Sequence, residues 1–195
     1  SGEQAAAAFF KGLDWYSLGQ LDQAATQFQV ASGPRREFFA AAFYLGAVLA
    51  ASGRDRDAAG VWQLALGDEP RPMMAYALLA DARLRDGQPG SVIDVLKPVH
   101  VREPENDDVS RRLSSAYLMV GRYKDALPVL EDYLSRNPTD EVALFAAVFA
   151  QYQVATRERL VLSDEVMTRV SRYVRAYEGP YEALLAKYLQ SIRGG

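Results

Sequence analysis

Large apolar residues recur along this chain at a constant interval of 34 residues. The clearest series is Phe28, Trp62, Leu96 and Leu130. A second apolar series follows three residues later, at Ala31, Ala65, Val99 and Tyr133. A small or β-branched residue stands four residues before each large one, at Ala24, Ala58, Val92 and Ala126. Self-similarity at such a period predicts one structural unit that is copied along the chain and packs against its neighbours.

Glycines follow the same interval and predict where helices end. They are Gly19, Gly53, Gly87 and Gly121. Each is expected to end the first helix of a pair, where a left-handed backbone conformation is needed. Seven residues earlier come Gly12, Gly46, Ala80 and Ser114. Residues this small are expected where two helices cross and their backbones approach closely.

Prolines predict the ends of the second helices. The position seventeen residues after each glycine is occupied by Arg36, Pro70, Pro104 and Pro138. Proline cannot continue a helix, although Pro89 suits the first turn of one. Pro98 falls late in the second helix of the third unit. Pro128 falls inside the second helix of the fourth unit, so a late start or a kink is expected there.

These series of residues at equivalent repeat positions, or columns, resemble the pattern of the tetratricopeptide repeat (TPR) family. The resemblance covers most of the chain. The second unit matches best, through Leu45, Gly46, Gly53, Ala58, Trp62, Ala65 and Pro70. The resemblance implies an all-α, right-handed α-solenoid of antiparallel helix pairs. Four repeats are expected at about 5–38, 39–72, 73–106 and 107–140, within a single array over 1–195. Lys11, Arg83 and Pro89 depart from the family pattern without breaking the period.

A degenerate fifth pair is expected at 141–178. Ala155 stands where the next glycine would fall, and the segment 156–162 shifts the partner helix out of register. Ser163 is the expected N-cap of that helix, with Asp164 and Glu165 in its first turn. One apolar face is predicted for it, made of Val166, Met167, Val170, Tyr173, Val174 and Tyr177.

A last helix is predicted at 180–192, after the break at Gly179 and Pro180. Its apolar stripe consists of Tyr181, Leu184, Leu185, Tyr188, Leu189 and Ile192. Solenoids need an atypical terminal element to cover their last open core face, so this helix is expected to cap the array. The alternative is a helix that docks in a groove of its own or a neighbouring molecule.

Composition restricts the function classes. Hydrophobic residues make up 49% of the chain, enough for a continuous core, and no apolar run reaches the length of a membrane span. The net charge of −3 gives no basic stripe for nucleic acid. Cysteine is absent, which is compatible with cytoplasm and periplasm alike. Only four of the 22 basic residues are lysine, a bias typical of GC-rich bacteria, and the opening Ser-Gly suggests a piece of a longer protein.

Candidate chemistry is sparse. His100 is the single histidine, so a His/Cys metal site is excluded and a Ser-His-Asp triad would need this residue. The acidic run Glu103, Glu105, Asp107 and Asp108 lacks the spacing of a calcium loop. We interpret it as a turn whose Asp residues favour the start of the next helix. No catalytic residue, metal or cofactor is therefore assigned, and an enzyme is not expected.

The resemblance implies that the first helices line a concave face, where a protein or peptide partner would bind. The candidate partner-binding residues are Phe9, Leu13, Tyr16, Phe43, Tyr44, Ala47, Met74, Asp81, Arg85, Arg111, Ser115, Phe145, Phe149 and Tyr152. Such an apolar and aromatic face suits an amphipathic helix or an extended peptide with apolar anchors. The carboxylate clamp of chaperone-binding members is absent, since Phe9, Leu13, Tyr44, Met74 and Leu78 occupy its places.

Two other interpretations of this face stay open. A short, tightly wound array can bury many of these aromatic side chains itself, or the last helix can cover them. A structural role is the second functional hypothesis, in which the chain self-associates through its terminal helices or serves as the regulatory tail of a larger protein. Light scattering over a range of concentrations distinguishes self-association from partner binding.

Overall fold

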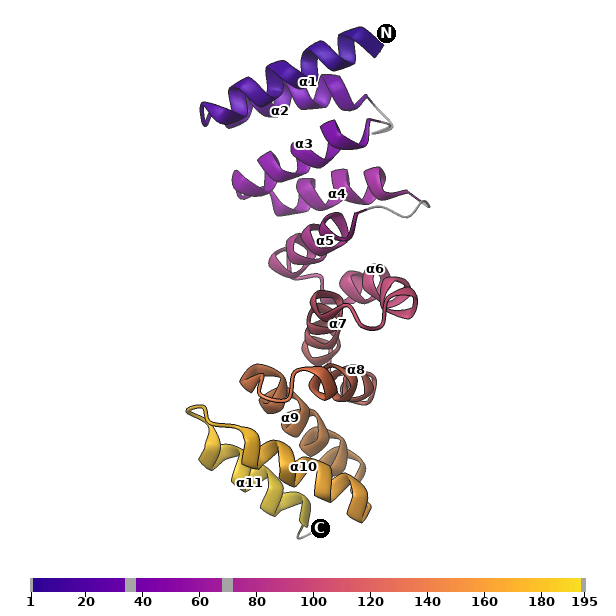
Figure 1. Cartoon of the computed structure of the whole chain (residues 1–195), viewed down its shortest axis with the longest axis vertical. Coiled ribbons are helices and arrows are strands. Elements are labelled where there is room, and N and C mark those ends of the chain that lie inside the picture. Colours follow the sequence, from indigo (N-terminus) through magenta and orange to yellow (C-terminus); the bar gives the residue numbers. More distant parts are fainter. Residues whose placement is uncertain (1, 34–37, 68–71, 194–195) are drawn as a thin grey trace. The chain divides into compact units, whose positions relative to one another are not determined.

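The protein is a repeat of helix pairs, as the periodic pattern predicts. A computed structural model describes residues 2–33, 38–67 and 72–193, and these residues form eleven α-helices and no β-strand (Figure 1). The expected all-α solenoid fold is therefore confirmed. The chain divides into two compact units, residues 1–95 (the N-terminal unit) and 96–195 (the C-terminal unit). A single array over 1–195 stays a prediction.

In the N-terminal unit, each helix packs against the next one in sequence. The helices are α1 (Gly2–Ser17), α2 (Leu21–Ser32), α3 (Phe39–Ala51), α4 (Asp55–Leu66) and α5 (Met73–Arg85). Contacts join α1 to α2, α2 to α3, α3 to α4 and α4 to α5. Helix α6 (Pro89–Arg102) starts in this unit, with Pro89 at its first position as expected, and contains the point at which the units are divided.

The C-terminal unit ends in a group of three mutually packed helices. Its helices are α7 (Asp107–Met119), α8 (Tyr123–Arg136), α9 (Glu141–Glu158), α10 (Asp164–Ala176) and α11 (Glu182–Arg193). Helix α8 packs on α7 and α9, whereas α10 and α11 both pack on α9 and on each other. Helix α9 is therefore the centre of this unit.

The four glycines at intervals of 34 residues, here called the glycine ladder, end the first helices, as predicted. Helices α1, α3, α5 and α7 each end two residues before a ladder glycine, and those glycines have φ angles of 71°, 73°, 71° and 74°. Only glycine adopts this left-handed region at little cost. Pro104 and Pro138 follow the ends of α6 and α8. Arg36 and Pro70, the other two residues of that series, lie outside the described residues.

Small residues on the first helices make room for large ones on the second. A Cβ atom added to Gly12 would lie 2.7 Å from the Phe28 ring, and one added to Gly46 would overlap the Trp62 ring. Trp62 is only 1% exposed, and its Nε1 donates a hydrogen bond to the Phe43 carbonyl oxygen at 3.1 Å. The helix crossing therefore depends on the missing side chain at these two positions.

Pro128 does not delay the helix that contains it. Helix α8 begins at Tyr123 and includes Pro128 at its sixth position, so the expected late start is wrong and the kink stays a prediction. Pro128 lacks the N–H that would reach the carbonyl of Lys124. Its own position is exposed, where water can satisfy that carbonyl, while Val129 and Leu130 are buried beside it.

Helix α9 continues past the position where the fifth glycine would fall. The helix runs through Ala155 to Glu158 and ends only at Arg159, the one described non-glycine residue with a left-handed backbone, at φ 50° and ψ 44°. The predicted N-cap of α10 is confirmed, because Ser163 Oγ accepts a hydrogen bond from the Val166 N–H at 3.4 Å. The shifted register of the fifth pair thus coincides with a longer first helix and a segment of five residues before α10.

A polar network joins the start of α7 to the end of α8. Asp107 accepts hydrogen bonds from Asn137 Nδ2 at 2.8 Å and Arg136 Nε at 3.1 Å. The bond from Asn137 is the main cause that lowers the pKa of Asp107. With Asn106 as the N-cap of α7, the acidic run is part of an inter-repeat turn, as interpreted.

A second hydrogen bond ties α8 to the start of α9. The Tyr133 hydroxyl donates to Asp140 Oδ2 at 2.6 Å, and burial followed by this bond raises the pKa of Tyr133 to about 12. Burial alone would raise the pKa of Asp140. The bond from Tyr133 and the backbone N–H groups of Ala143 and Val142 outweigh that effect and lower it. Asp140 is also the N-cap of α9, so it should stay ionised to hold this turn.

Candidate protein-interaction face

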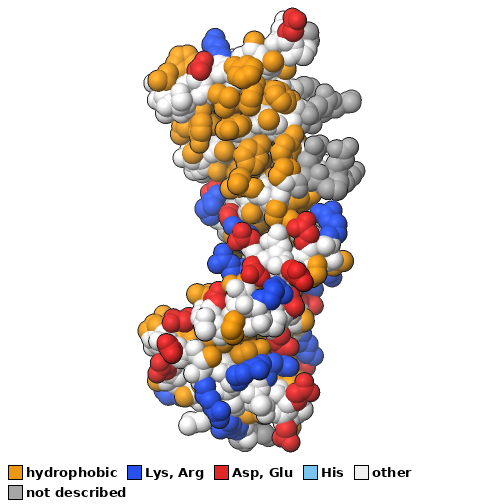
Figure 2. All heavy atoms as spheres, viewed as in Figure 1, with side chains coloured by type: hydrophobic (Ala, Val, Ile, Leu, Met, Phe, Trp, Pro, Cys, Tyr) orange, Lys and Arg blue, Asp and Glu red, His pale blue; other side chains and the backbone are white. Residues whose placement is uncertain are grey.

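The predicted partner-binding residues of the N-terminal unit lie on its first helices and keep part of their surface exposed. They are Phe9, Leu13 and Tyr16 on α1, Phe43, Tyr44 and Ala47 on α3, and Met74, Asp81 and Arg85 on α5. We call this surface the N-terminal first-helix face. Tyr16 is 40% exposed and Met74 65% exposed, and in the view of Figure 2 hydrophobic side chains gather densely over this unit.

Aromatic contacts stiffen this face at the junction of α1 and α3. The ring of Phe9 lies 5.1 Å from that of Phe38 and 5.8 Å from that of Tyr44, centroid to centroid. Tyr44 stacks on Phe28 at 5.4 Å and meets the edge of Tyr16 at 6.1 Å. Tyr44 is therefore wedged between the two helices, and its main role is to hold the face together.

The charged residues of this face lie towards one end of α5. Arg85 donates from Nε to Asp55 Oδ1 at 2.8 Å, so its charge is offset by a carboxylate at the start of α4. Asp81 is half-buried one turn earlier on the same helix. Helix α3 contributes Ala40, Ala47 and Ala51 to the middle of the face, without a polar side chain among them.

The C-terminal unit shows a polar portion on α7. Arg111 and Ser115, both predicted as partner-binding residues, are exposed there. Arg111 Nη2 donates to Asp108 Oδ1 at 3.2 Å, one turn earlier on the helix. This exposed pair contributes little to stability, because water screens it.

On α9 the predicted residues are covered by α11. Tyr152 stacks on Tyr188 with ring centroids 4.3 Å apart, and Phe149 lies 6.1 Å from the same ring. Phe145 contacts Tyr181 at 5.4 Å. The three predicted residues are consequently half-buried, and the covering rings are Tyr188 of α11 and Tyr181, directly before that helix.

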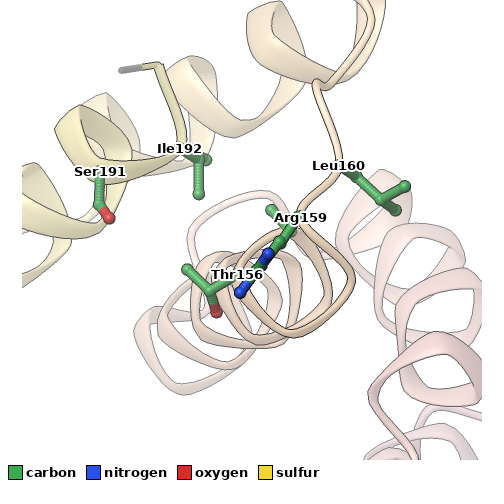
Figure 3. Close-up of a pocket in the computed structure, with 6 residues that line it drawn as sticks. Thr156, Arg159, Leu160, Ser191 and Ile192 are labelled. Atoms are coloured by element: carbon green, nitrogen blue, oxygen red, sulfur yellow. The ribbon is translucent and has the colours of Figure 1, made fainter. Parts of the chain in front are cut away.

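A pocket of about 350 Å³ lies where the ends of α9 and α11 meet. It is lined by Ala155, Thr156, Arg159, Leu160, Ser191 and Ile192 (Figure 3). The Thr156 hydroxyl donates to the Tyr152 carbonyl oxygen at 2.7 Å, so it serves its own helix. Arg159 is the one charged side chain of the lining, and no second charge accompanies it to define a ligand.

The remaining candidate chemistry has a structural explanation. His100 Nδ1 lies 3.5 Å from Ser110 Oγ, and burial is the main cause that lowers the pKa of His100. Ser110 is completely buried, which leaves its hydroxyl inaccessible to a substrate. Within the described residues, no group of three or more His, Asp or Glu side chains could hold a metal ion. None of the described helices is both long and apolar enough to cross a membrane.

Sequence reasoning missed several aromatic residues next to the predicted partner-binding residues of α1, α3 and α9. Phe10 is 64% exposed beside Phe9, and Phe38 precedes α3. The doublets Phe9-Phe10 and Phe38-Phe39 were the available signal. The rings of Tyr123 and Phe149 meet edge-on with their centroids 5.7 Å apart. The guanidinium of Arg157 lies 4.7 Å from the centroid of the Tyr123 ring. No local pattern points to that contact, because it joins two helices, α8 and α9.

Comparisons with known proteins agree with this repeat geometry. Residues 83–151 match the family model described as tetratricopeptide repeat. The structure is similar to that of MamA, with a TM-score of 0.70 and 19% identity over 96% of this chain and 97% of that one. It is also similar to YrrB, described as a TPR protein with an unusual peptide-binding site, with a TM-score of 0.71 and 15% identity over 95% and 92%. No curated protein sequence matches the chain.

The class is therefore an all-α repeat protein built from stacked helix pairs. Identities this low establish the fold alone. Residues 83–151 match the tetratricopeptide repeat, as the glycine period indicated, and the described chain has the fold of tetratricopeptide-repeat structures.

Proposed function

We propose that this chain is a non-enzymatic interaction module whose N-terminal first-helix face binds a protein or peptide partner. The observation that carries the proposal is the exposure of apolar side chains there, above all Tyr16 and Met74. Monomeric proteins rarely expose contiguous apolar surface unless it serves an interface. The tetratricopeptide fold is typically used for such binding, and YrrB offers a precedent of a peptide-binding site on it.

The mode of binding would differ from a carboxylate clamp. A clamp needs cationic and amide side chains that converge on a terminal carboxylate, whereas the corresponding places here hold Phe9, Leu13, Tyr44, Met74 and Leu78. Apolar anchors on the partner would therefore supply most of the affinity. Blocking the C-terminal carboxylate of the partner as an amide should leave its dissociation constant unchanged.

Site-specific photo-cross-linking in cells of the source organism tests this location. The photoreactive residue benzoyl-phenylalanine replaces Tyr16 or Met74 on the proposed face and, as a matched control, Leu64 on α4, which is about as exposed as Met74. The proposal expects a discrete cross-linked partner from the first two positions and none from Leu64. The reverse distribution, or cross-links from all three positions alike, would reject the N-terminal first-helix face.

Self-association is the second candidate function, because Phe10 on α1, Leu18 in the following turn and Val30 on α2 are all exposed. Light scattering from micromolar to millimolar chain concentrations tests it. A constant molar mass equal to one chain removes this candidate, whereas a rising mass that Phe10→Ser abolishes supports it.

A further inference from the structure

The composition of the N-terminal first-helix face narrows the class of partner, if the proposed function is correct. We infer that this face binds a basic amphipathic α-helix, and not an extended peptide. Two independent observations carry the inference: the lack of hydrogen-bonding groups in the middle of the face, and the sign of the charges along its edges.

The middle of the face cannot satisfy the backbone of an extended peptide. Helix α3 presents Ala40, Phe43, Ala47 and Ala51 there. The Ser17 hydroxyl at one side donates its proton to the Asp14 carbonyl oxygen at 2.8 Å, so it has no donor left for a peptide carbonyl. An extended peptide would bury N–H and C=O groups against this surface without partners, which is costly for each group. A helix bonds those groups internally, so it can lie on an apolar floor.

The small side chains of α3 also suit a helix sterically. Ala40, Ala47 and Ala51 succeed one another at spacings of seven and four residues and therefore share one side of α3. Alanine lets the axis of a second helix approach closely, and larger apolar groups flank the floor at Leu13 on α1 and Met74 on α5. A partner helix with a single apolar stripe is the complement of such a surface.

The charges along the edges favour a cationic partner. On α1, Glu3 and Asp14 flank the exposed Phe10 at spacings of seven and four residues, and all three side chains are exposed. On α5, the exposed Arg85 pairs with Asp55, so it contributes no net positive charge. Lys11 is the exposed cation nearby. Residues 1–95 contain 8 Lys and Arg against 11 Asp and Glu, so the whole net charge of −3 lies in this unit.

Synthetic peptides of about 18 residues test the inference, since that length supports a helix on binding. The basic probe carries leucine at positions i, i+3, i+4 and i+7 and lysine elsewhere. Its two controls are the same leucine pattern with glutamate, and the leucine and lysine composition of the probe in strict alternation, which favours an extended chain. Fluorescence anisotropy at physiological salt should give the basic helix a dissociation constant about tenfold below that of either control.

Two pairs of variants locate the binding. Ala47→Lys should weaken the basic helix about tenfold, whereas Ser115→Lys, at the equivalent repeat position 68 residues later, should change its affinity less than about twofold. Glu3→Gln combined with Asp14→Asn should weaken it about threefold and flatten its salt dependence. Asp22→Asn on α2 is the matched acidic control. Circular dichroism checks that each variant keeps its helices.

The outcomes separate this inference from the function on which it rests. Equal or tighter binding of the glutamate helix, or tighter binding of the alternating peptide, overturns the inference. The proposed interaction face is then still supported if Ala47→Lys weakens the binding of whichever peptide binds more tightly. Binding that ignores Ala47→Lys, or no binding of any probe, also overturns the inference, and the cross-linking from Tyr16 and Met74 then decides the proposed function.

Discussion

The first-helix faces of the two units share a register but differ in what covers them. Phe145, Phe149 and Tyr152 on α9 lie 136 residues, or four repeat lengths, after Phe9, Leu13 and Tyr16 on α1. Both sets pack against a later helix through tyrosine. Tyr44 of α3 meets α1, and Tyr188 of α11 meets α9.

The difference lies in the outer surface of the covering helix. The outer positions of α3 are alanines, with Ala51 exposed and Ala40 and Ala47 half-buried, so the aromatic junction of the N-terminal unit continues into an apolar floor. Helix α11 exposes Ala183 and Ala186 as well, but Glu182, Lys187, Gln190 and Ser191 interrupt its outer surface with polar groups. The same aromatic contact thus leads to an open face in one unit and a closed face in the other. We propose on this basis that α11 caps the array.

The largest predicted effect comes from loosening α11. Leu185→Ala removes a completely buried side chain and should lower the free energy of unfolding of the C-terminal unit by about 3 kcal/mol. Denaturant unfolding measures the loss, and hydrogen exchange should show faster opening of α9 but not of α3. Leu64→Ala, at an exposed leucine, is the control and should cost less than about 0.5 kcal/mol. Uniformly faster exchange in both units would contradict a local cap.

A smaller effect is expected from the crossing of α3 and α4. Gly46→Ala places a Cβ inside the Trp62 ring and should cost about 2 kcal/mol, because the buried ring cannot move aside. Trp62→Leu alone should also destabilise the N-terminal unit by leaving a cavity. The double variant recreates the combination of Ala80 and Leu96 that the third repeat uses. It should be more stable than the sum of the single losses predicts, as a double-mutant cycle measures.

Exchanging the helix-ending residues tests why α9 is longer. Gly121→Ala forces alanine into φ 74° and should cost about 1 kcal/mol. Ala155→Gly should also cost about 1 kcal/mol, because glycine weakens a helix interior. What distinguishes Ala155→Gly from a general loss of stability is faster hydrogen exchange at 156–158. These residues lie beyond the point where the other first helices end. Unchanged protection there would mean that packing, and not Ala155, sets the length of α9.

The smallest effect is a pH dependence confined to the C-terminal unit. The pKa of Asp140 is below its ordinary value of 3.8, so its ionisation contributes stability that is present above that value and lost as pH falls through the folded-state pKa. Asp140→Asn keeps an N-cap but not the charge, and should be less stable at neutral pH by under about 1 kcal/mol. Thermal unfolding should show this difference shrinking towards pH 3. A difference independent of pH would remove the charge from the explanation.

Much of the fold could be predicted because it depends on local and repeated chemistry. The ladder from Gly19 to Gly121 predicted four helix ends, and each glycine has the left-handed backbone that it implies. Phe28 and Trp62 were predicted in the core by their place in a column, and both are buried. The predicted late start of the helix at Pro128 was wrong because the effect of a proline depends on its exposure. At an exposed position, water can satisfy the carbonyl that the missing N–H leaves without a partner.

The candidate face was harder to predict than the core. Periodicity identified which side of each first helix carries Phe9, Phe43 and Phe145, but not which of these sides is covered. That depends on contacts such as Tyr152 with Tyr188, between residues whose separation follows no repeat. Phe10 was overlooked because its column equivalent, Tyr44, packs inward, whereas α1 has no earlier helix within the described residues to receive it.

The sequence by itself determined the repeat: its period, its helix ends and the pairing of small with large residues at each crossing. These follow from backbone conformation at glycine and from side-chain volume, both of which act within one unit. Only the tertiary structure decided how far α9 extends and that α11 covers its aromatic side. Those outcomes depend on the packing of helices that share no register with the repeat, so the residues that make them carry no periodic signal.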